Sequence, residues 1–145
     1  AAGGHSSVCG QDCDAAPIPA AALGVEGGDA VSARVAVLTC SDRASRGAYE
    51  DKSGPAIVDA LDAFAARSGA LSVSHVQRRV LPDEEAEIAG CLRSWSESRA
   101  CDVIFTTGGT GLGPRDVTPE ATRPLIARAA EGLARAMAWQ TSFQE

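Results

Sequence analysis

The stretch VIFTTGGTGLGPRDVTPEAT, residues 103–122, joins an apolar run to a glycine-rich loop and then to a helix start. The apolar run Val103–Phe105 predicts a short strand that is buried on both faces. Thr118 followed by Pro119 predicts the first turn of a helix, because proline is favoured at the first helical position. This stretch therefore predicts a strand, a loop and a helix in succession.

The same alternation precedes this stretch. Residues 35–38 form another short apolar run and predict a buried strand. A helix is predicted to open at Ser53-Gly54-Pro55 and to stop at Gly69. Its apolar residues recur at helical spacing: Ile57, Val58, Leu61, Phe64 and Ala65. A second strand is predicted over residues 71–81.

Asp83 is predicted to cap a second helix, with acidic residues in its favourable first turn. The inner stripe of that helix is formed by Ile88, Cys91, Leu92 and Trp95. Later in the chain, Pro124 removes a hydrogen bond at the sixth position of the helix whose first helical position is Pro119. Either that helix kinks there, or it starts later with Thr122 as its cap. Residues 133–143 predict a last helix.

The order strand, helix, strand, helix, strand predicts an α/β fold with parallel strands joined by right-handed crossovers. In such sheets, ligands bind outside the carboxyl ends of the strands. The polar clusters TCSD (39–42), LPD (81–83) and TTGGTG (106–111) follow the three predicted strands, so we expect them to share one edge.

These clusters indicate phosphate chemistry. Hydroxyl groups and backbone amides exposed by glycine are good hydrogen-bond donors to phosphate oxygens. Asp42, Asp83 and Asp116 offer the oxygen ligands that Mg²⁺ prefers. Phosphates, amides and carboxylate-bound magnesium together indicate phosphoryl or nucleotidyl transfer.

Each group also has a purely structural interpretation. The glycines would then be turn formers, Asp83 a helix cap and Asp42 a turn residue. Asp116 would pair with Arg115 or another arginine, while Arg115 either contacts phosphate or braces the loop. His75 lies among strand residues and is interpreted as structural.

The loop matches neither of two common nucleotide motifs. A P-loop requires lysine after its last glycine, but Leu112 follows Gly111. The dinucleotide fingerprint fails because Pro114 stands where its last glycine is needed.

Composition and charge limit the remaining possibilities. The chain has 145 residues, which predicts about one domain, and a net charge of −6. Residues 1–30 carry four of those negative charges and are dominated by Ala and Gly, so they are predicted to be a flexible linker or tail. The rest is nearly neutral, which argues against duplex nucleic-acid binding. No apolar run approaches the ~20 residues of a membrane span.

The cysteines indicate a reducing, cytoplasmic setting, because their number, five, is odd and does not give the even count typical of a disulfide framework. Cys9 and Cys13, with His5 nearby, are interpreted as thiols of the linker rather than as a metal clip. The remaining three are interpreted as small buried hydrophobes: Cys40, Cys91 and Cys101.

Residues 106–122 closely resemble the signature of the MogA-like molybdenum-cofactor biosynthesis family, which includes the G domains of gephyrin and of plant Cnx-type proteins. Two further segments agree in order and spacing, CSDRASRGAYEDKSGP (40–55) and LPDE (81–84). The flanking motifs most resemble the adenylyltransferase branch. The resemblance covers residues 34–145 and makes 31–145 the expected molybdopterin-binding domain.

This resemblance implies a three-layer α/β sandwich with a mostly parallel sheet, usually trimeric, that adenylylates molybdopterin. The family reaction converts molybdopterin and ATP, with Mg²⁺, to adenylyl-molybdopterin and pyrophosphate. Asp83 and Asp116 would be the catalytic and magnesium-binding carboxylates, with their separate roles left open. The other residues expected to bind nucleotide or substrate are Ser41, Asp42, Ser53, Gly108, Gly109, Thr110, Gly111 and Arg115.

Family members continue beyond the position of Glu145, so we expect the domain to be incomplete at its C-terminus. A fused or partner molybdenum-insertion domain is also implied. Two other functions remain open: a binding or trimeric scaffold domain that holds molybdopterin without turnover, and a MoaB-like or competence-damage-type domain with another ligand.

Overall fold

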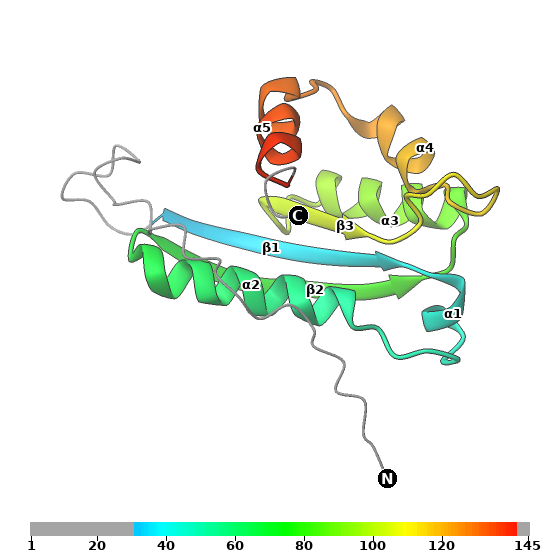
Figure 1. Ribbon diagram of the computed structural model, residues 1–145, viewed down its shortest axis with the longest axis horizontal. Coiled ribbons are helices and arrows are strands. Elements are labelled where there is room, and N and C mark those ends of the chain that lie inside the picture. Colours follow the sequence, from blue (N-terminus) through cyan, green and yellow to red (C-terminus); the bar gives the residue numbers. More distant parts are fainter. Residues whose placement is uncertain (1–30, 142–145) are drawn as a thin grey trace, which may run out of the picture.

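The computed structural model describes residues 31–141, and its centre is a strand buried on both faces. β1 (Val31–Cys40) lies between β2 (Leu71–Leu81) and β3 (Val103–Thr107) and pairs in parallel with both. From Val35 to Cys40, no residue of β1 is more than 5% exposed. All three strands point their carboxyl ends toward the same edge of the sheet (Figure 1). The predicted parallel α/β sheet is confirmed.

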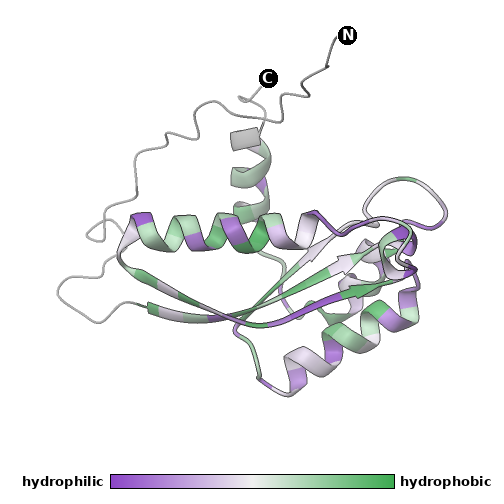
Figure 2. Cartoon of the chain, turned by 90° about the horizontal axis from the view of Figure 1, so that it is seen from below, coloured by the Kyte–Doolittle hydropathy of each residue, from purple (hydrophilic) through white to green (hydrophobic). Residues whose placement is uncertain are grey.

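Helices cover both faces of this sheet. α2 (Ser53–Ser68) and α3 (Glu85–Glu97) lie on opposite sides of the strands (Figure 2). The main buried cluster joins one face of β1 to α3 and α4, through Ala36, Leu38, Cys40, Ile88, Cys91, Leu92, Trp95 and Ala121. The expected three-layer arrangement is therefore confirmed, and the inner stripe predicted for α3 is the buried one.

Short local signals set several element boundaries. Gly69 ends α2 in the left-handed conformation, with φ of 62°, and donates its N–H to the carbonyl of Ala65. The capping role predicted for Asp83 is wrong, because Glu84 is the N-cap of α3 and no side chain caps it there. The carboxylate of Asp83 instead accepts a hydrogen bond from the backbone N–H of Asp42.

The segment around Pro124 is a short helix followed by a tighter turn. α4 (Thr118–Thr122) begins where the sequence predicts, so the alternative of a later start is wrong. It passes directly into the 3₁₀ turn η2 (Arg123–Leu125), which contains Pro124. α5 (Glu131–Thr141) then accounts for the last predicted helix within the described residues. A single turn, α1 (Asp42–Ser45), follows β1.

The remaining expectations concern the cysteines, His75 and the first segment. Cys40 and Cys91 are buried and Cys101 is partly buried, all as free thiols. His75 Nε2 lies 2.7 Å from Asp62 Oδ1, a contact between β2 and α2 that fits a structural role. Residues 1–30, with Cys9 and Cys13, lie outside the described residues. Within residues 31–141, no helix has the length and apolar character needed to cross a membrane.

Candidate functional site

A cavity of about 270 Å³ lies at the carboxyl edge of the sheet. It is formed where the loops after β1, β2 and β3 meet the start of α2. The residues that line it are Thr39, Cys40, Ser41, Ala44, Tyr49, Asp51, Ser53, Asp83, Gly108, Gly109 and Asp116. Parallel strands thus bring together segments that lie far apart in the sequence.

The two carboxylate oxygens of Asp83 differ, because one is hydrogen-bonded and the other is not. Its Oδ2 accepts a hydrogen bond of 2.8 Å from the N–H of Asp42. Its Oδ1 is buried and has no hydrogen-bond partner among the described residues. Buried polar atoms are almost always satisfied, because leaving one unsatisfied costs roughly 1–3 kcal/mol or more. This oxygen is therefore available to a ligand that enters the cavity.

At Gly108 and Gly109, the glycine loop lies closer to its neighbours than a residue with a side chain would allow. Gly108 and Gly109 have φ of +83° and +58°, which few non-glycine residues adopt. A Cβ added to Gly109 would lie 2.7 Å from Asp83 Oδ1, and one added to Gly108 would overlap the carbonyl oxygen of Cys40. These glycines form a turn, but they also bring the loop backbone against the end of β1 and the carboxylate of Asp83.

Asp116 brings a second carboxylate to the same cavity from the far end of the loop. Its Oδ2 accepts a hydrogen bond of 2.9 Å from the N–H of Gly113. A Cβ on Gly111 or Gly113 would lie 2.8 Å from that oxygen, so small residues leave room for it. The alternative that Asp116 pairs with an arginine is wrong, because none of its contacts in the described part of the chain is with one.

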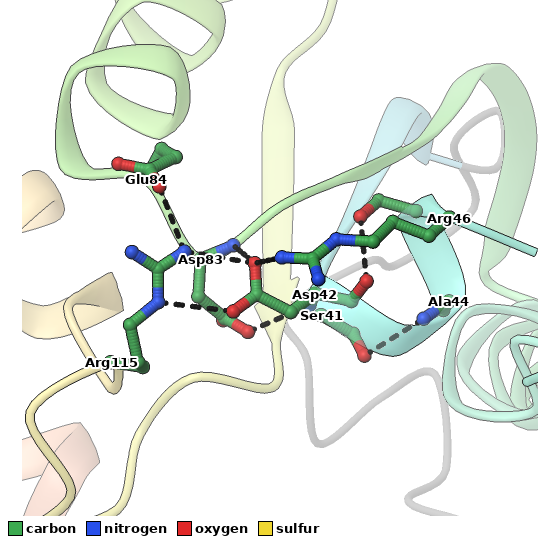
Figure 3. Close-up of polar contacts among 8 residues, drawn as sticks. Ser41, Asp42, Ala44, Arg46, Asp83, Glu84 and Arg115 are labelled. Carbon is green, nitrogen blue, oxygen red and sulfur yellow. Dashed lines mark hydrogen bonds and ion pairs between the residues drawn. The ribbon is translucent and has the colours of Figure 1, made fainter. Parts of the chain in front are cut away.

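Arg115 braces the loop through two carboxylates of the neighbouring loops (Figure 3). Its Nε and Nη2 donate to the two oxygens of Asp42 at 3.0 and 2.9 Å, and Nη2 lies 2.8 Å from Glu84 Oε1. The hydrogen bonds from Arg115 hold the pKa of Asp42 below its usual value, and the two carboxylates raise the pKa of Arg115. Both carboxylate oxygens of Asp42 are therefore engaged by Arg115, and the magnesium-binding role suggested for Asp42 stays a prediction.

The predicted site residues divide into three groups. Six line the cavity directly: Ser41, Ser53, Asp83, Gly108, Gly109 and Asp116. Asp42 and Arg115 contact one another beside Asp83, and Gly111 packs against Asp116. Thr110 lies apart, on a second cavity of about 500 Å³ formed with α4 and η2.

Sequence reasoning missed Thr39 and Asp51 as site residues. The carboxylate of Asp51 accepts a 3.1 Å hydrogen bond from the Thr39 hydroxyl and another of 3.1 Å from the N–H of Gly54. It thereby ties the first turn of α2 to the end of β1. The available signal is the position of Asp51 immediately before the Lys52-Ser53-Gly54-Pro55 segment.

The cavity is acidic, and its charge limits what it can bind. Three carboxylates and no lysine or arginine appear among its described lining residues. Within residues 31–139, no three His, Cys, Asp or Glu side chains are grouped to hold a metal ion by themselves. Magnesium is commonly held by one or two protein carboxylates together with substrate phosphates and water. The unsatisfied Oδ1 of Asp83 and the nearby carboxylate of Asp116 fit that mode.

Residues 36–144 match a family model described as a probable molybdopterin binding domain. The chain is 43% identical over 107 residues to gephyrin from Dictyostelium discoideum, covering 71% of this chain and 15% of gephyrin. It is 36% identical over 104 residues to molybdopterin adenylyltransferase from Escherichia coli K12, covering 72% and 51%. The crystal structure of MoaB from Thermus thermophilus, a molybdopterin biosynthesis enzyme, aligns with a TM-score of 0.64 and 40% identity, covering 72% and 62%. The chain thus spans about half the length of the E. coli protein.

Proposed function

The chain belongs to the family of probable molybdopterin-binding domains, and we propose that it acts in molybdenum cofactor biosynthesis as a molybdopterin adenylyltransferase. In the proposed reaction, a terminal phosphate oxygen of molybdopterin attacks the α-phosphorus of ATP. The bond from that phosphorus to the oxygen bridging to the β-phosphate breaks, and pyrophosphate leaves with that oxygen. The products are adenylyl-molybdopterin and pyrophosphate.

The observation that carries this proposal is the buried, unpartnered Oδ1 of Asp83 on the same cavity as the carboxylate of Asp116. A polyphosphate entering a cavity lined by three carboxylates and no basic side chain would be repelled unless a cation accompanied it. Asp83 and Asp116 are the residues that would hold Mg²⁺. When bound, this ion neutralises phosphate charge, which is a major part of catalysis in phosphoryl transfer.

The other lining residues orient the substrates. Gly108 and Gly109 bring loop backbone to the cavity without a side chain in the way, which suits contact with phosphate oxygens. The hydroxyl group of Ser53 lies at the start of α2, where anions are favoured, and Ser41 lines the cavity with its hydroxyl oxygen accepting from the N–H of Ala44. Positioning of this kind brings the attacking oxygen and the α-phosphorus together, which accounts for much of the rate in such reactions.

The test is pyrophosphate release by the full-length protein supplied with molybdopterin, ATP and Mg²⁺. We expect Asp83→Asn and Asp116→Asn each to lower the rate at least about 100-fold, the scale of losing one electrostatic group at a transition state. Asp59→Asn is the matched control, because this carboxylate lies exposed on α2, away from the cavity. Turnover that survives both cavity substitutions would refute the assignment.

A domain that holds molybdopterin without turnover is the second candidate, because the family model matched by residues 36–144 is described as a probable molybdopterin binding domain. Isothermal titration separates the two functions: molybdopterin binding by the wild type without AMP transfer would favour the binding domain. We further propose that the domain forms a homotrimer and works with a molybdenum-insertion domain, either fused or separate. Light scattering on the purified protein tests the trimer.

A further inference from the structure

One side chain joins the glycine loop to the ends of the other two strands. Within the described part of the chain, every hydrogen bond and ion pair from residues 108–117 to the loops after β1 and β2 is made by Arg115. Its partners are Asp42, after β1, and Glu84, after β2 (Figure 3). The guanidinium therefore bridges all three segments that form the cavity.

The first of these partners is itself bonded to the carboxylate that has the free oxygen. The N–H of Asp42 donates to Asp83 Oδ2 at 2.8 Å, and the N–H of Asp83 donates back to Asp42 Oδ1 at 3.3 Å. This reciprocal pair fixes which oxygen of Asp83 is occupied and which one remains free. Arg115 holds the Asp42 side chain with two parallel hydrogen bonds, a geometry that restricts rotation as well as separation.

The second carboxylate lies one residue from this arginine, because Asp116 follows Arg115 in the chain. Asp116 and Asp83 reach the cavity from different loops, and their separation depends on how those loops are held together. A site that would bind Mg²⁺ through both carboxylates needs the distance between them to be constant.

We propose that Arg115 is a positioning residue that sets the placement of Asp83 and Asp116 relative to each other by way of Asp42 and Glu84. The inference rests on the proposed function for its Mg²⁺ and ATP-analogue binding readout only. Arg115 acts through its carboxylate partners rather than by touching phosphate. In the structure its guanidinium is already committed to three carboxylate oxygens, and it is absent from the cavity lining.

The experiment compares Arg115→Ala and Arg115→Lys with Arg46→Ala in the full-length protein. Arg46 is the matched control, because it pairs with the same Asp42 oxygen at 3.4 Å but is 71% exposed and belongs to the same loop as Asp42. Titration with Mg²⁺ and a non-hydrolysable ATP analogue should show about 10–100-fold weaker binding for Arg115→Ala, as for other partners that orient metal ligands. Lysine should restore binding in part, since it supplies the charge without the two-pronged geometry. Arg46→Ala should change binding by less than about threefold, because exposed ion pairs contribute little.

Hydrogen exchange gives a readout that does not depend on activity. The loop amides of residues 108–117 should exchange faster in Arg115→Ala than in the wild type and in Arg46→Ala, while the amides of β1 should be unchanged. If the wild type proves unable to transfer AMP, the proposed function fails, but exchange still decides the role of Arg115. Unchanged exchange in the loop would overturn the positioning role.

A second background separates positioning from direct phosphate contact. In a protein that already carries Asp42→Ala and Glu84→Ala, Arg115 has lost both partners through which it is proposed to act. Adding Arg115→Ala should then weaken analogue binding by less than about threefold, because coupled residues are not additive. A loss as large as that in the wild-type background would show that Arg115 contacts the ligand itself and would overturn the inference.

Discussion

Replacing Gly108 by alanine tests whether close packing at the end of β1 shapes the loop. Gly108 has φ of +83°, and forcing an L-residue into the left-handed region costs about 1–2 kcal/mol. The added Cβ would also overlap the carbonyl oxygen of Cys40, in the central strand, where the side chain is 1% exposed. Overpacking of this kind typically costs about 1–3 kcal/mol. Together the two effects predict a loss of about 2–5 kcal/mol in the free energy of unfolding.

Gly47→Ala provides the matched control for this substitution. Gly47 has a similar φ of +71°, but a Cβ there would meet no atom within 4 Å. It should therefore cost only the backbone penalty of about 1–2 kcal/mol. The effect on the unfolded chain is the same for both substitutions and cancels in the comparison.

Urea unfolding followed by far-UV circular dichroism measures both variants, with the free energy taken by linear extrapolation. We expect Gly108→Ala to be less stable than Gly47→Ala by about 1–3 kcal/mol, with an unchanged slope. Equal stabilities, within about 0.5 kcal/mol, would show that the contact with Cys40 relaxes freely and would refute the reasoning.

Three further substitutions test other parts of the molecule. Ile88→Ala should lower the free energy of urea unfolding by about 2–5 kcal/mol, because this side chain is 0% exposed in the core; a loss below 1 kcal/mol, roughly, would contradict the packing. Hydrogen bonds from Arg34 lower the pKa of Asp102 to about 2, so the contribution of this pair to stability is full above pH ~4 and is lost as the pH falls toward 2. Asp102→Asn should therefore flatten the fall in the urea midpoint over that pH range. An unchanged fall would contradict this prediction. Gly109→Ala should weaken binding of Mg²⁺ with the ATP analogue about 10–100-fold by displacing Asp83, measured by titration calorimetry; wild-type affinity would contradict this.

Local patterns predicted the elements well where hydrophobic burial determines them. The apolar run at residues 35–38 corresponds to the buried part of β1, although the strand extends over residues 31–40. The exposed end of β1 carries no such signal, because pairing with β2 rather than burial makes it a strand. Gly69 correctly predicts the end of α2, because the residue there has a left-handed conformation that glycine adopts readily.

The site was harder to predict because its geometry depends on contacts between loops. The order of strands and helices was sufficient to bring Asp83 and Asp116 to one cavity. Local sequence favoured Asp83 as a helix cap, but its partner is the backbone of Asp42, 41 residues away. Sequence spacing does not decide whether Arg115 contacts phosphate or braces the loop, because both of its carboxylate partners come from other loops.

The glycine loop is held at its two ends by different physical means. At the first end, Gly108 lies against the carbonyl of Cys40 and the carbonyl of Gly109 accepts a hydrogen bond from the N–H of Thr118, so the restraints involve no charged side chain and are insensitive to salt. At the other end, Arg115 is held by charge and hydrogen bonding to Asp42 and Glu84, side chains that remain partly exposed and are therefore screened by salt. Leu112, between the two ends, is fully exposed, so the middle of the loop adds no packing to either restraint. Because Gly109 and Asp116 lie next to the two held ends, both restraints act on residues that line the cavity.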